Sequence, residues 1–167
     1  VEAGAWRAPG LDAVPKAARA GFMGGMQTTT NLLASAALGM PAQGPLPHSF
    51  VLTMPNELDA LRAFARRMPG AVLVVDTYDS IKSVRNAVAL ARELRDESPV
   101  SAIRIDSGDL LDLSRRARNL LDGAGLGNLR IMAGGCLDEH AIEGLVSKGA
   151  PIDAFAVDGG LGAAPEA

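Results

Sequence analysis

The chain has 167 residues, a formal net charge of −3 at pH 7, one cysteine and two histidines. Its composition, 48% hydrophobic and 21% charged, is typical of a globular protein with a substantial core. The lack of a basic stripe argues against partners such as nucleic acid or an anionic membrane, and no run of about 18 apolar residues predicts a membrane span. The single cysteine excludes an internal disulfide framework and fits a cytoplasmic protein.

Residues 1–70 are expected to form a helical segment and a histidine loop that lead into the rest of the chain. Apolar spacing, with glycine and proline as stop signals, predicts the helices in this segment. They are residues 14–38 in two pieces that break near Gly24-Gly25, the second running from Thr28 to Leu38, then residues 49–54 and 57–67. A proline-rich loop over residues 40–47 precedes His48, and Asn56 is a suitable N-cap for the helix that follows it.

From residue 71 onward, short apolar runs alternate with amphipathic helices. The expected strands are residues 71–75, 101–105, 129–133 and 152–157, and the expected helices are residues 80–95, 109–121 and 137–147. This alternation implies right-handed crossovers and a parallel sheet, either open or closed into a barrel. Four strands are half of an eight-stranded barrel, and half a barrel leaves two open edges. Because the sequence also begins at Val1, we expect residues 71–167 to be part of one incomplete domain.

Acidic and glycine residues follow each expected strand, at the edge where parallel α/β folds place their sites. Carboxylates at neighbouring strand ends can bind ribose hydroxyls or a magnesium ion, and glycine-rich turns can present N–H groups to a phosphate. We therefore expect a phosphorylated sugar as ligand. The alternative is structural, since such aspartates also cap helices and such glycines also form tight turns. The segments are Asp76-Thr77-Tyr78-Asp79, Asp106-Ser107-Gly108-Asp109, Gly134-Gly135 and Asp158-Gly159-Gly160.

Arg104 lies inside an expected strand, between two isoleucines. A buried arginine is costly unless it meets an anion, so we expect a ligand there, with an ion pair to Asp76 as the alternative. His48 follows the rigid loop, but a lone histidine is more often structural than catalytic, and the local sequence does not decide between the two.

Several segments match one family in order and spacing. They are Glu2–Gly10, Gly24–Ala34, Gly44–Phe50, Val75–Asp79, Ile103–Leu110, Leu137–Glu139 and Ile152–Phe155. Over nearly the whole chain, this pattern resembles the nicotinate phosphoribosyltransferases. The resemblance implies an α/β fold, a partial parallel β/α barrel of the type II phosphoribosyltransferase kind. It also implies a homodimer in the cytoplasm.

The same resemblance implies a reaction in NAD salvage. Nicotinate and phosphoribosyl pyrophosphate would give nicotinate mononucleotide and pyrophosphate, coupled to ATP through a transient phosphohistidine at His48, with Mg2+ beside the pyrophosphate. By position, the substrate-binding residues would be Arg7, Gly44, Ser49, Asp76, Arg104, Asp106 and Ser107. The phosphate-binding residues would be Gly134, Gly135 and Gly159. The resemblance does not assign the metal ligands.

Four positions depart from the family pattern. Trp6 replaces the first of two arginines, Pro45 replaces a loop threonine, and Gly134 replaces a serine. Asp158 brings a carboxylate into the phosphate-binding turn, where it would repel the ligand. Because of these departures, an alternative remains: a non-catalytic or degenerate barrel that binds a phosphosugar or has only a structural role. A relative acting on nicotinamide or quinolinate would share the fold, but the histidine loop and the Arg104–Asp109 segment favour nicotinate.

Overall fold

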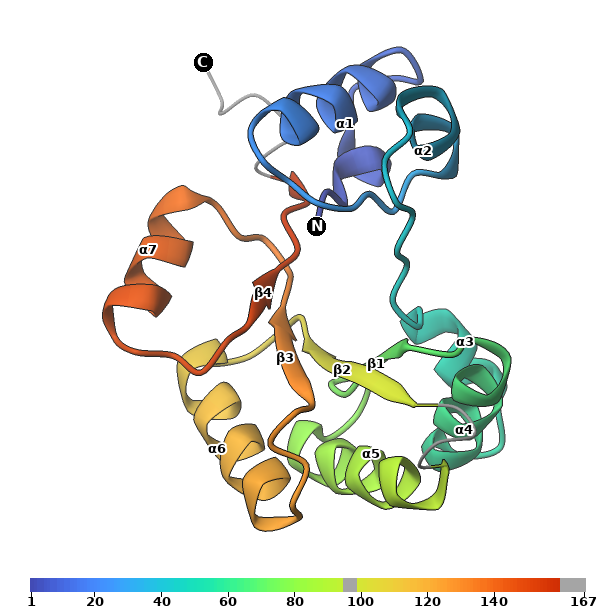
Figure 1. The fold of residues 1–167 in the computed structure, drawn as a ribbon, viewed down its shortest axis with the longest axis vertical. Coiled ribbons are helices and arrows are strands. Elements are labelled where there is room, and N and C mark those ends of the chain that lie inside the picture. The colour runs from blue at the N-terminus through green and yellow to red at the C-terminus, as the bar shows by residue number, and fades with distance from the viewer. Residues whose placement is uncertain (95–98, 160–167) are drawn as a thin grey trace. The chain divides into compact units, whose positions relative to one another are not determined.

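The computed structural model describes residues 1–94 and 99–159, apart from the side chains of Trp6 and Arg7. The predicted helix end at Arg95 and the glycine at position 160 lie outside the described residues. The chain divides into two compact units (Figure 1). Unit 1 consists of Val1–Gly44, Gly134–Ser147 and the residues from Phe155 onward, and unit 2 consists of Pro45–Ala133 and Lys148–Ala154.

Unit 2 contains strands β1, β2 and β3 of the parallel sheet that the alternating pattern predicts. The strands run in the order β1-β2-β3-β4, where β4 is only the two residues Ala154–Phe155. In the register, Arg104 is paired with Val74 on one side and with Met132 on the other. The remaining strands and the helices of unit 2 have these bounds: β1 Ala71–Val74, β2 Val100–Ile105, β3 Arg130–Ala133, α3 His48–Thr53, α4 Glu57–Arg67, α5 Ser80–Leu94 and α6 Leu110–Gly123.

The core of unit 2 lies between the sheet and its helices. All four residues of β1 are buried, as a continuous apolar run predicts for a strand covered on both faces. Leu61, Leu90 and Leu121, from three successive helices, are fully buried in one apolar cluster with Leu73 and Ile103. Each such side chain contributes about 1.5–3 kcal/mol on burial, so this cluster holds the strand ends in place.

Side-chain caps fix where two of these helices begin. The Asn56 side chain accepts the N–H of Asp59 at 2.9 Å, which confirms the predicted cap of α4. Asp109 Oδ1 accepts the N–H groups of Leu111 and Asp112 at 3.0 and 3.1 Å. Asp109 therefore caps a helix, which was the structural alternative to binding a ligand. Helix α6 begins one residue later than predicted.

Unit 1 contains the short 3-10 helix η1 (Gly4–Arg7) and the helices α1 (Ala13–Met23), α2 (Leu32–Leu38) and α7 (Glu139–Ser147). The prediction that a helix begins at Thr28 is wrong. Thr29 instead forms parallel β-bridges with Glu2 and Ala42, and Asn31 is extended and caps α2 through the N–H groups two and three residues later. An asparagine can satisfy these N–H groups only from a non-helical conformation, so the helix starts after it.

Glu2 is the centre of this part of unit 1. Its side chain is buried, and its carboxylate accepts the N–H of Gly4 at 2.7 Å and the hydroxyl of Thr29. On the other side its backbone is bridged to Val157. The predicted strand over residues 152–157 is therefore a short β4 followed by an isolated bridge, because its last residue pairs with the start of the chain.

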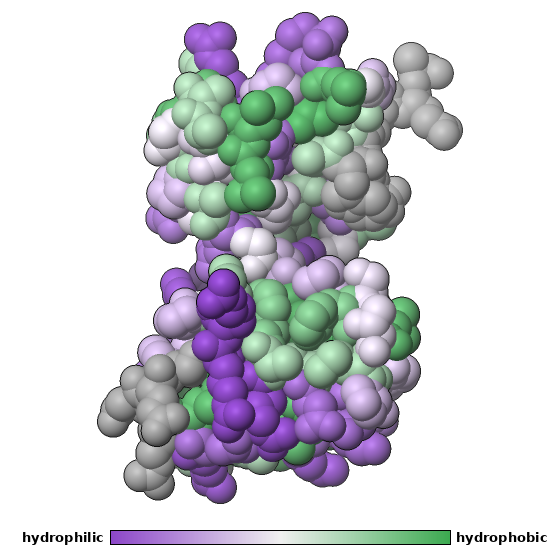
Figure 2. All heavy atoms as spheres, turned by 90° about the vertical axis from the view of Figure 1, so that its right-hand side faces the viewer, coloured by the Kyte–Doolittle hydropathy of each residue, from purple (hydrophilic) through white to green (hydrophobic). Residues whose placement is uncertain are grey.

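Apolar side chains also lie on the surface of unit 1. Leu32 and Leu33 of α2 are 75% and 72% exposed, and Met23 at the end of α1 is 77% exposed. Figure 2 shows apolar side chains gathered on one face of this unit. Among the described residues, no helix has the length and apolar character needed to cross a membrane.

Candidate active site

Two carboxylates meet where β1 and β2 end. Asp106 donates its backbone N–H to Asp76 Oδ2 at 2.9 Å, and the Ser107 hydroxyl donates to the same oxygen at 2.5 Å. The Asp76 side chain is only 1% exposed. The parallel register places these strand ends side by side. It therefore brings Asp76 and Asp106, 30 positions apart in the sequence, into one polar site.

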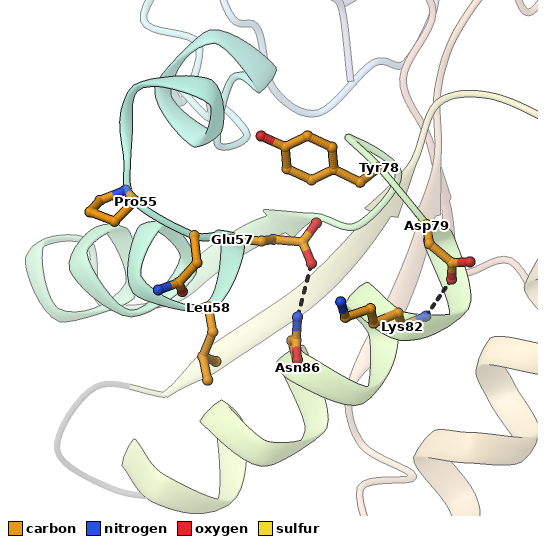
Figure 3. Close-up of a pocket in the computed structure, with 8 residues that line it drawn as sticks. Pro55, Glu57, Leu58, Tyr78, Asp79, Lys82 and Asn86 are labelled. Carbon is orange, nitrogen blue, oxygen red and sulfur yellow. Dashed lines mark hydrogen bonds between the residues drawn. The ribbon is translucent and has the colours of Figure 1, made fainter.

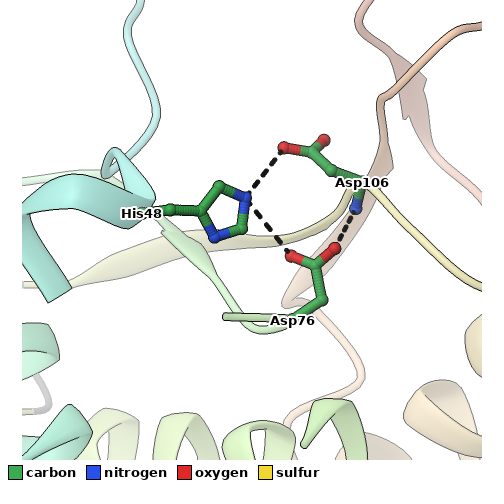
Figure 4. A group of neighbouring side chains, drawn as sticks. All are labelled: His48, Asp76 and Asp106. Carbon is green, nitrogen blue, oxygen red and sulfur yellow. Dashed lines mark hydrogen bonds and ion pairs between the residues drawn. The ribbon is translucent and has the colours of Figure 1, made fainter. Parts of the chain in front are cut away.

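His48 approaches the two carboxylates from the first turn of α3 (Figure 4). Its Nδ1 lies 2.9 Å from the Thr77 hydroxyl, and its Nε2 lies 3.9 Å from Asp76 Oδ1 and 3.7 Å from Asp106 Oδ2. The loop before it is held against β1, since buried Leu46 donates its N–H to the carbonyl of Val72. With 44% of its side chain exposed, His48 presents Nε2 to both the carboxylates and solvent.

Arg104 forms an ion pair with Asp106, its Nε lying 2.5 Å from Asp106 Oδ1. The alternative expectation of a pair with Asp76 is therefore wrong. Residues two apart in extended backbone point to the same face, which brings Arg104, near the end of β2, together with Asp106, the residue after this strand. The arginine side chain is 11% exposed, so it is a nearly buried cation beside the two acids.

The pKa of Asp106 is raised above its ordinary value. Burial of the carboxyl group is the main cause, since it disfavours the charged form, and the charge of Asp76 acts in the same direction. Arg104 and His48 oppose the rise. The site thus holds two neighbouring acids, of which one is easier to protonate than an isolated aspartate.

This cluster also has the donor set of a divalent-cation site. His48, Asp76 and Asp106 each offer one ligand atom, and these atoms all lie within 4.8 Å of one another. Asp76 Oδ1 is buried and has no hydrogen-bond partner among the described residues, so it can accept a cation or an N–H from the imidazole. Magnesium prefers carboxylate oxygens, so the two aspartates fit it better than the imidazole does.

Comparison with known proteins shows what the chain as a whole is similar to. Over 157 residues, the chain is 44% identical to a nicotinate phosphoribosyltransferase of Mycobacterium tuberculosis, covering 94% of this chain and 34% of that protein. The chain is a homologue of part of nicotinate phosphoribosyltransferase. It is also 38% identical over 158 residues to the nicotinate phosphoribosyltransferase of Bacillus subtilis, covering 94% of this chain and 32% of that protein. It thus spans about a third of the length of these curated relatives, and no protein-family model matches it.

Two solved structures share the fold of this chain. The structure titled nicotinate-nucleotide pyrophosphorylase from Pyrococcus furiosus superposes with a TM-score of 0.80 at 25% identity, covering 96% of this chain and 42% of that one. Human nicotinic acid phosphoribosyltransferase gives a TM-score of 0.83 at 23% identity, covering 94% and 43%. These neighbours and the parallel sheet confirm the predicted α/β fold, a partial barrel of the type II phosphoribosyltransferase kind.

The structure brings together five of the residues that the resemblance to nicotinate phosphoribosyltransferases singled out: His48, Asp76, Arg104, Asp106 and Ser107. Ser49 is exposed on α3, and among the described residues no side-chain hydrogen bond joins it to the cluster. Thr77, which holds the His48 ring, was not predicted. Its position directly after the strand-end aspartate was the only available signal, and many threonines share it.

The other predicted residues of the nicotinate phosphoribosyltransferase pattern lie in unit 1. Arg7 is the last residue of η1, and Gly44 is exposed at the end of the first segment of this unit. Gly134 is buried and Gly135 has a φ of +89°, which suits glycine in the turn after β3. Gly159 donates its N–H to the carboxylate of its neighbour, the buried Asp158.

Proposed function

We propose that this chain is a catalytic segment of a nicotinate phosphoribosyltransferase, which joins nicotinate to phosphoribosyl pyrophosphate and yields nicotinate mononucleotide and pyrophosphate in NAD salvage. One observation carries the proposal: the cluster of His48, Asp76, Arg104 and Asp106, in a chain 44% identical to an enzyme of that name. Cytoplasmic location and a homodimer belong to the proposal through the resemblance, and the single cysteine fits the former.

His48 is the proposed nucleophile toward ATP. Its Nδ1 is held by the Thr77 hydroxyl, and its Nε2 is directed at the carboxylates and reachable from solvent. Attack by Nε2 on the terminal phosphorus would form an N–P bond while the bond from phosphorus to the ADP oxygen breaks. An imidazole held at one nitrogen attacks with the other, so Thr77 orients the ring for this step.

The remaining cluster residues bind and orient in this proposal. Arg104, nearly buried, supplies positive charge for an anionic substrate, and the Ser107 hydroxyl and Asp106 can hydrogen-bond ribose hydroxyls. The carboxylate oxygens of Asp76 and Asp106 would hold Mg2+, which neutralises a pyrophosphate leaving group when bound. Gly134 and Gly135 would present backbone N–H groups to the 5′-phosphate.

A second function is favoured by one contact in unit 1. The Asp158 carboxylate is buried and accepts the N–H of Gly159, one of the donors proposed for the phosphate. Because this N–H is already used and the added charge repels phosphate, the contact supports a degenerate barrel that is structural or binds a phosphosugar weakly.

Product formation distinguishes the two functions. Purified chain is incubated with nicotinate, phosphoribosyl pyrophosphate, Mg2+ and ATP, and nicotinate mononucleotide is quantified by chromatography. His140, exposed on α7, provides the matched control. Product that needs ATP, disappears in His48→Ala and persists in His140→Ala supports the enzyme. A folded chain that gives no product refutes catalysis by these residues alone and favours the degenerate barrel.

A further inference from the structure

A polar cavity lies in unit 2, and none of the active-site cluster lines it. Its volume is about 400 Å3, within the range of roughly 300–1,000 Å3 that small-molecule sites occupy. One wall is the start of α4 and the other is the loop after β1 together with the first turns of α5 (Figure 3). The residues that carry the argument are Glu57, Leu58, Tyr78, Asp79, Lys82 and Asn86.

Glu57 brings an unsatisfied acidic oxygen to this cavity. Its Oε2 accepts the side-chain N–H of Asn86 at 2.9 Å, whereas its Oε1 is buried and has no hydrogen-bond partner among the described residues. Figure 3 shows the free oxygen turned away from Asn86, on the side of Tyr78. Burial of a charged oxygen without a donor costs free energy, so an occupant that brings a cationic N–H donor would be stabilised here.

Lys82 adds a positively charged side chain to the lining of the cavity. Within residues 1–94 and 99–159, no ion pair joins its ammonium group to a carboxylate. The nearest acid in the sequence, Asp79, uses Oδ1 to cap α5 by accepting the Lys82 backbone N–H at 2.7 Å. The Lys82 ammonium can therefore bind an anionic group of a ligand, near the start of a helix whose dipole also favours negative charge.

Besides the charges of Glu57 and Lys82, the cavity has an apolar part. Tyr78 is 65% exposed, which is high for a large aromatic side chain, and Leu58 lines the same cavity from α4. A ligand that covers the Tyr78 ring would remove apolar surface from water. The cavity is thus lined by residues that offer an acceptor for a cation, a donor for an anion and an apolar wall.

We propose that this cavity binds an α-amino acid with an apolar side chain. Its ammonium group meets Glu57 Oε1, its carboxylate meets Lys82, and its side chain packs on Tyr78 and Leu58. A zwitterion of this kind matches both charges of the lining, whereas a simple amine or a simple carboxylate matches only one.

Both walls of the cavity continue segments that carry the active site. The loop after β1 gives Asp76 and Thr77 to the active site and then Tyr78 to the cavity, while α3 starts at His48 and leads into the other wall. An occupant that shifts this loop changes the contact between His48 and Thr77. The His48 ring can therefore report on an occupant that shifts this loop, and ligand binding in the cavity does not depend on the proposed transferase activity.

The test is an NMR titration of the whole chain with three related probes. L-phenylalanine carries both charges, L-phenylalaninamide lacks the carboxylate, and 3-phenylpropionate lacks the ammonium group. We expect saturable binding of L-phenylalanine below about 10 mM, with shifts at Tyr78 and at the His48 ring, and about tenfold or more weaker binding of both analogues. Absence of saturable binding, or equal affinity for all three probes, would overturn the proposal.

Variants locate the binding to the cavity. Glu57→Gln and Lys82→Gln should each weaken L-phenylalanine binding by about tenfold or more. Glu143→Gln on α7 and Lys16→Gln on α1 remove matched exposed charges and should leave it unchanged. If the Glu57 and Lys82 variants bind as the parent does, the cavity is not the site. The analogue series on the unaltered chain decides the outcome even if a variant does not fold.

Discussion

Replacing Arg104 with methionine tests how much the ion pair between Arg104 and Asp106 stabilises the fold. Methionine keeps much of the length of the side chain and removes the cation, so Asp106 loses the 2.5 Å contact to its Oδ1. Breaking a fully buried ion pair costs about 3–5 kcal/mol. Because the two side chains are still 11% and 19% exposed, water compensates in part. We expect the free energy of unfolding to fall by about 2–3 kcal/mol at pH 7.

The loss should depend on pH. The pKa of Asp106 is already above its ordinary value in the folded chain, so the folded state binds the proton more tightly than the unfolded state. Stability from this group therefore falls as the pH rises from the ordinary aspartate pKa through the folded pKa. Without Arg104, which lowers the Asp106 pKa, that window extends further upward. The cost of the variant should thus be largest near pH 7 and smaller near pH 4, because protonation of the carboxyl group removes the charge that Arg104 balances.

Urea unfolding of parent and variant at both pH values measures the difference. The same substitution in an Asp106→Asn background supplies the matched control, since no carboxylate is left to lose its partner. We expect most of the loss at pH 7 to disappear in that background. A loss that is equal at both pH values and persists beside Asn at position 106 would refute the electrostatic reasoning and assign the effect to packing.

Three further substitutions test the core, a cap and the histidine. Leu61→Ala should lower the free energy of unfolding by about 2–5 kcal/mol, whereas the same change at Leu52, 61% exposed, should cost less than about 0.5 kcal/mol. Asn56→Ala should cost about 1 kcal/mol in the same urea assay, and replacement by aspartate should restore most of it. Thr77→Val removes the partner of His48 Nδ1, so 15N NMR should change from one imidazole tautomer to a mixture; an unchanged spectrum would contradict the orienting role.

Local chemistry made much of the fold predictable. The buried run of β1 and the caps at Asn56 and Asp109 depend on residues within a few positions of one another, where composition and spacing are informative. Thr29 shows the limit of such reasoning. The residues around it carry a helical pattern, but its pairing with Glu2 and Ala42 depends on chain segments that are distant in sequence. Tertiary pairing overrode local propensity there.

Part of the candidate site was likewise predictable from the sequence, and part depends on tertiary contacts. The aspartates at the strand ends were identifiable because parallel strands end at one edge of the sheet. The ion pair of Arg104 was predicted with Asp76, whereas the structure pairs Arg104 with Asp106, two residues further along the same chain segment. Contacts across elements were not accessible: the Thr77 hydroxyl at His48 depends on how α3 meets the loop after β1.

The bridges of Glu2 also have a consequence for the order of events during synthesis. The first residues pair with segments near position 157, and the Val1 amino group reaches the carbonyl of Phe155, 154 residues away. A ribosome adds about 5–20 residues per second, so Val157 is added roughly 8–30 s after Glu2. In that interval the Thr29 side of Glu2 can pair and the other side cannot. Glu2 is thus fully paired only after Val157 has been made, and for those seconds its backbone offers an open β edge to chaperones or to a neighbouring chain.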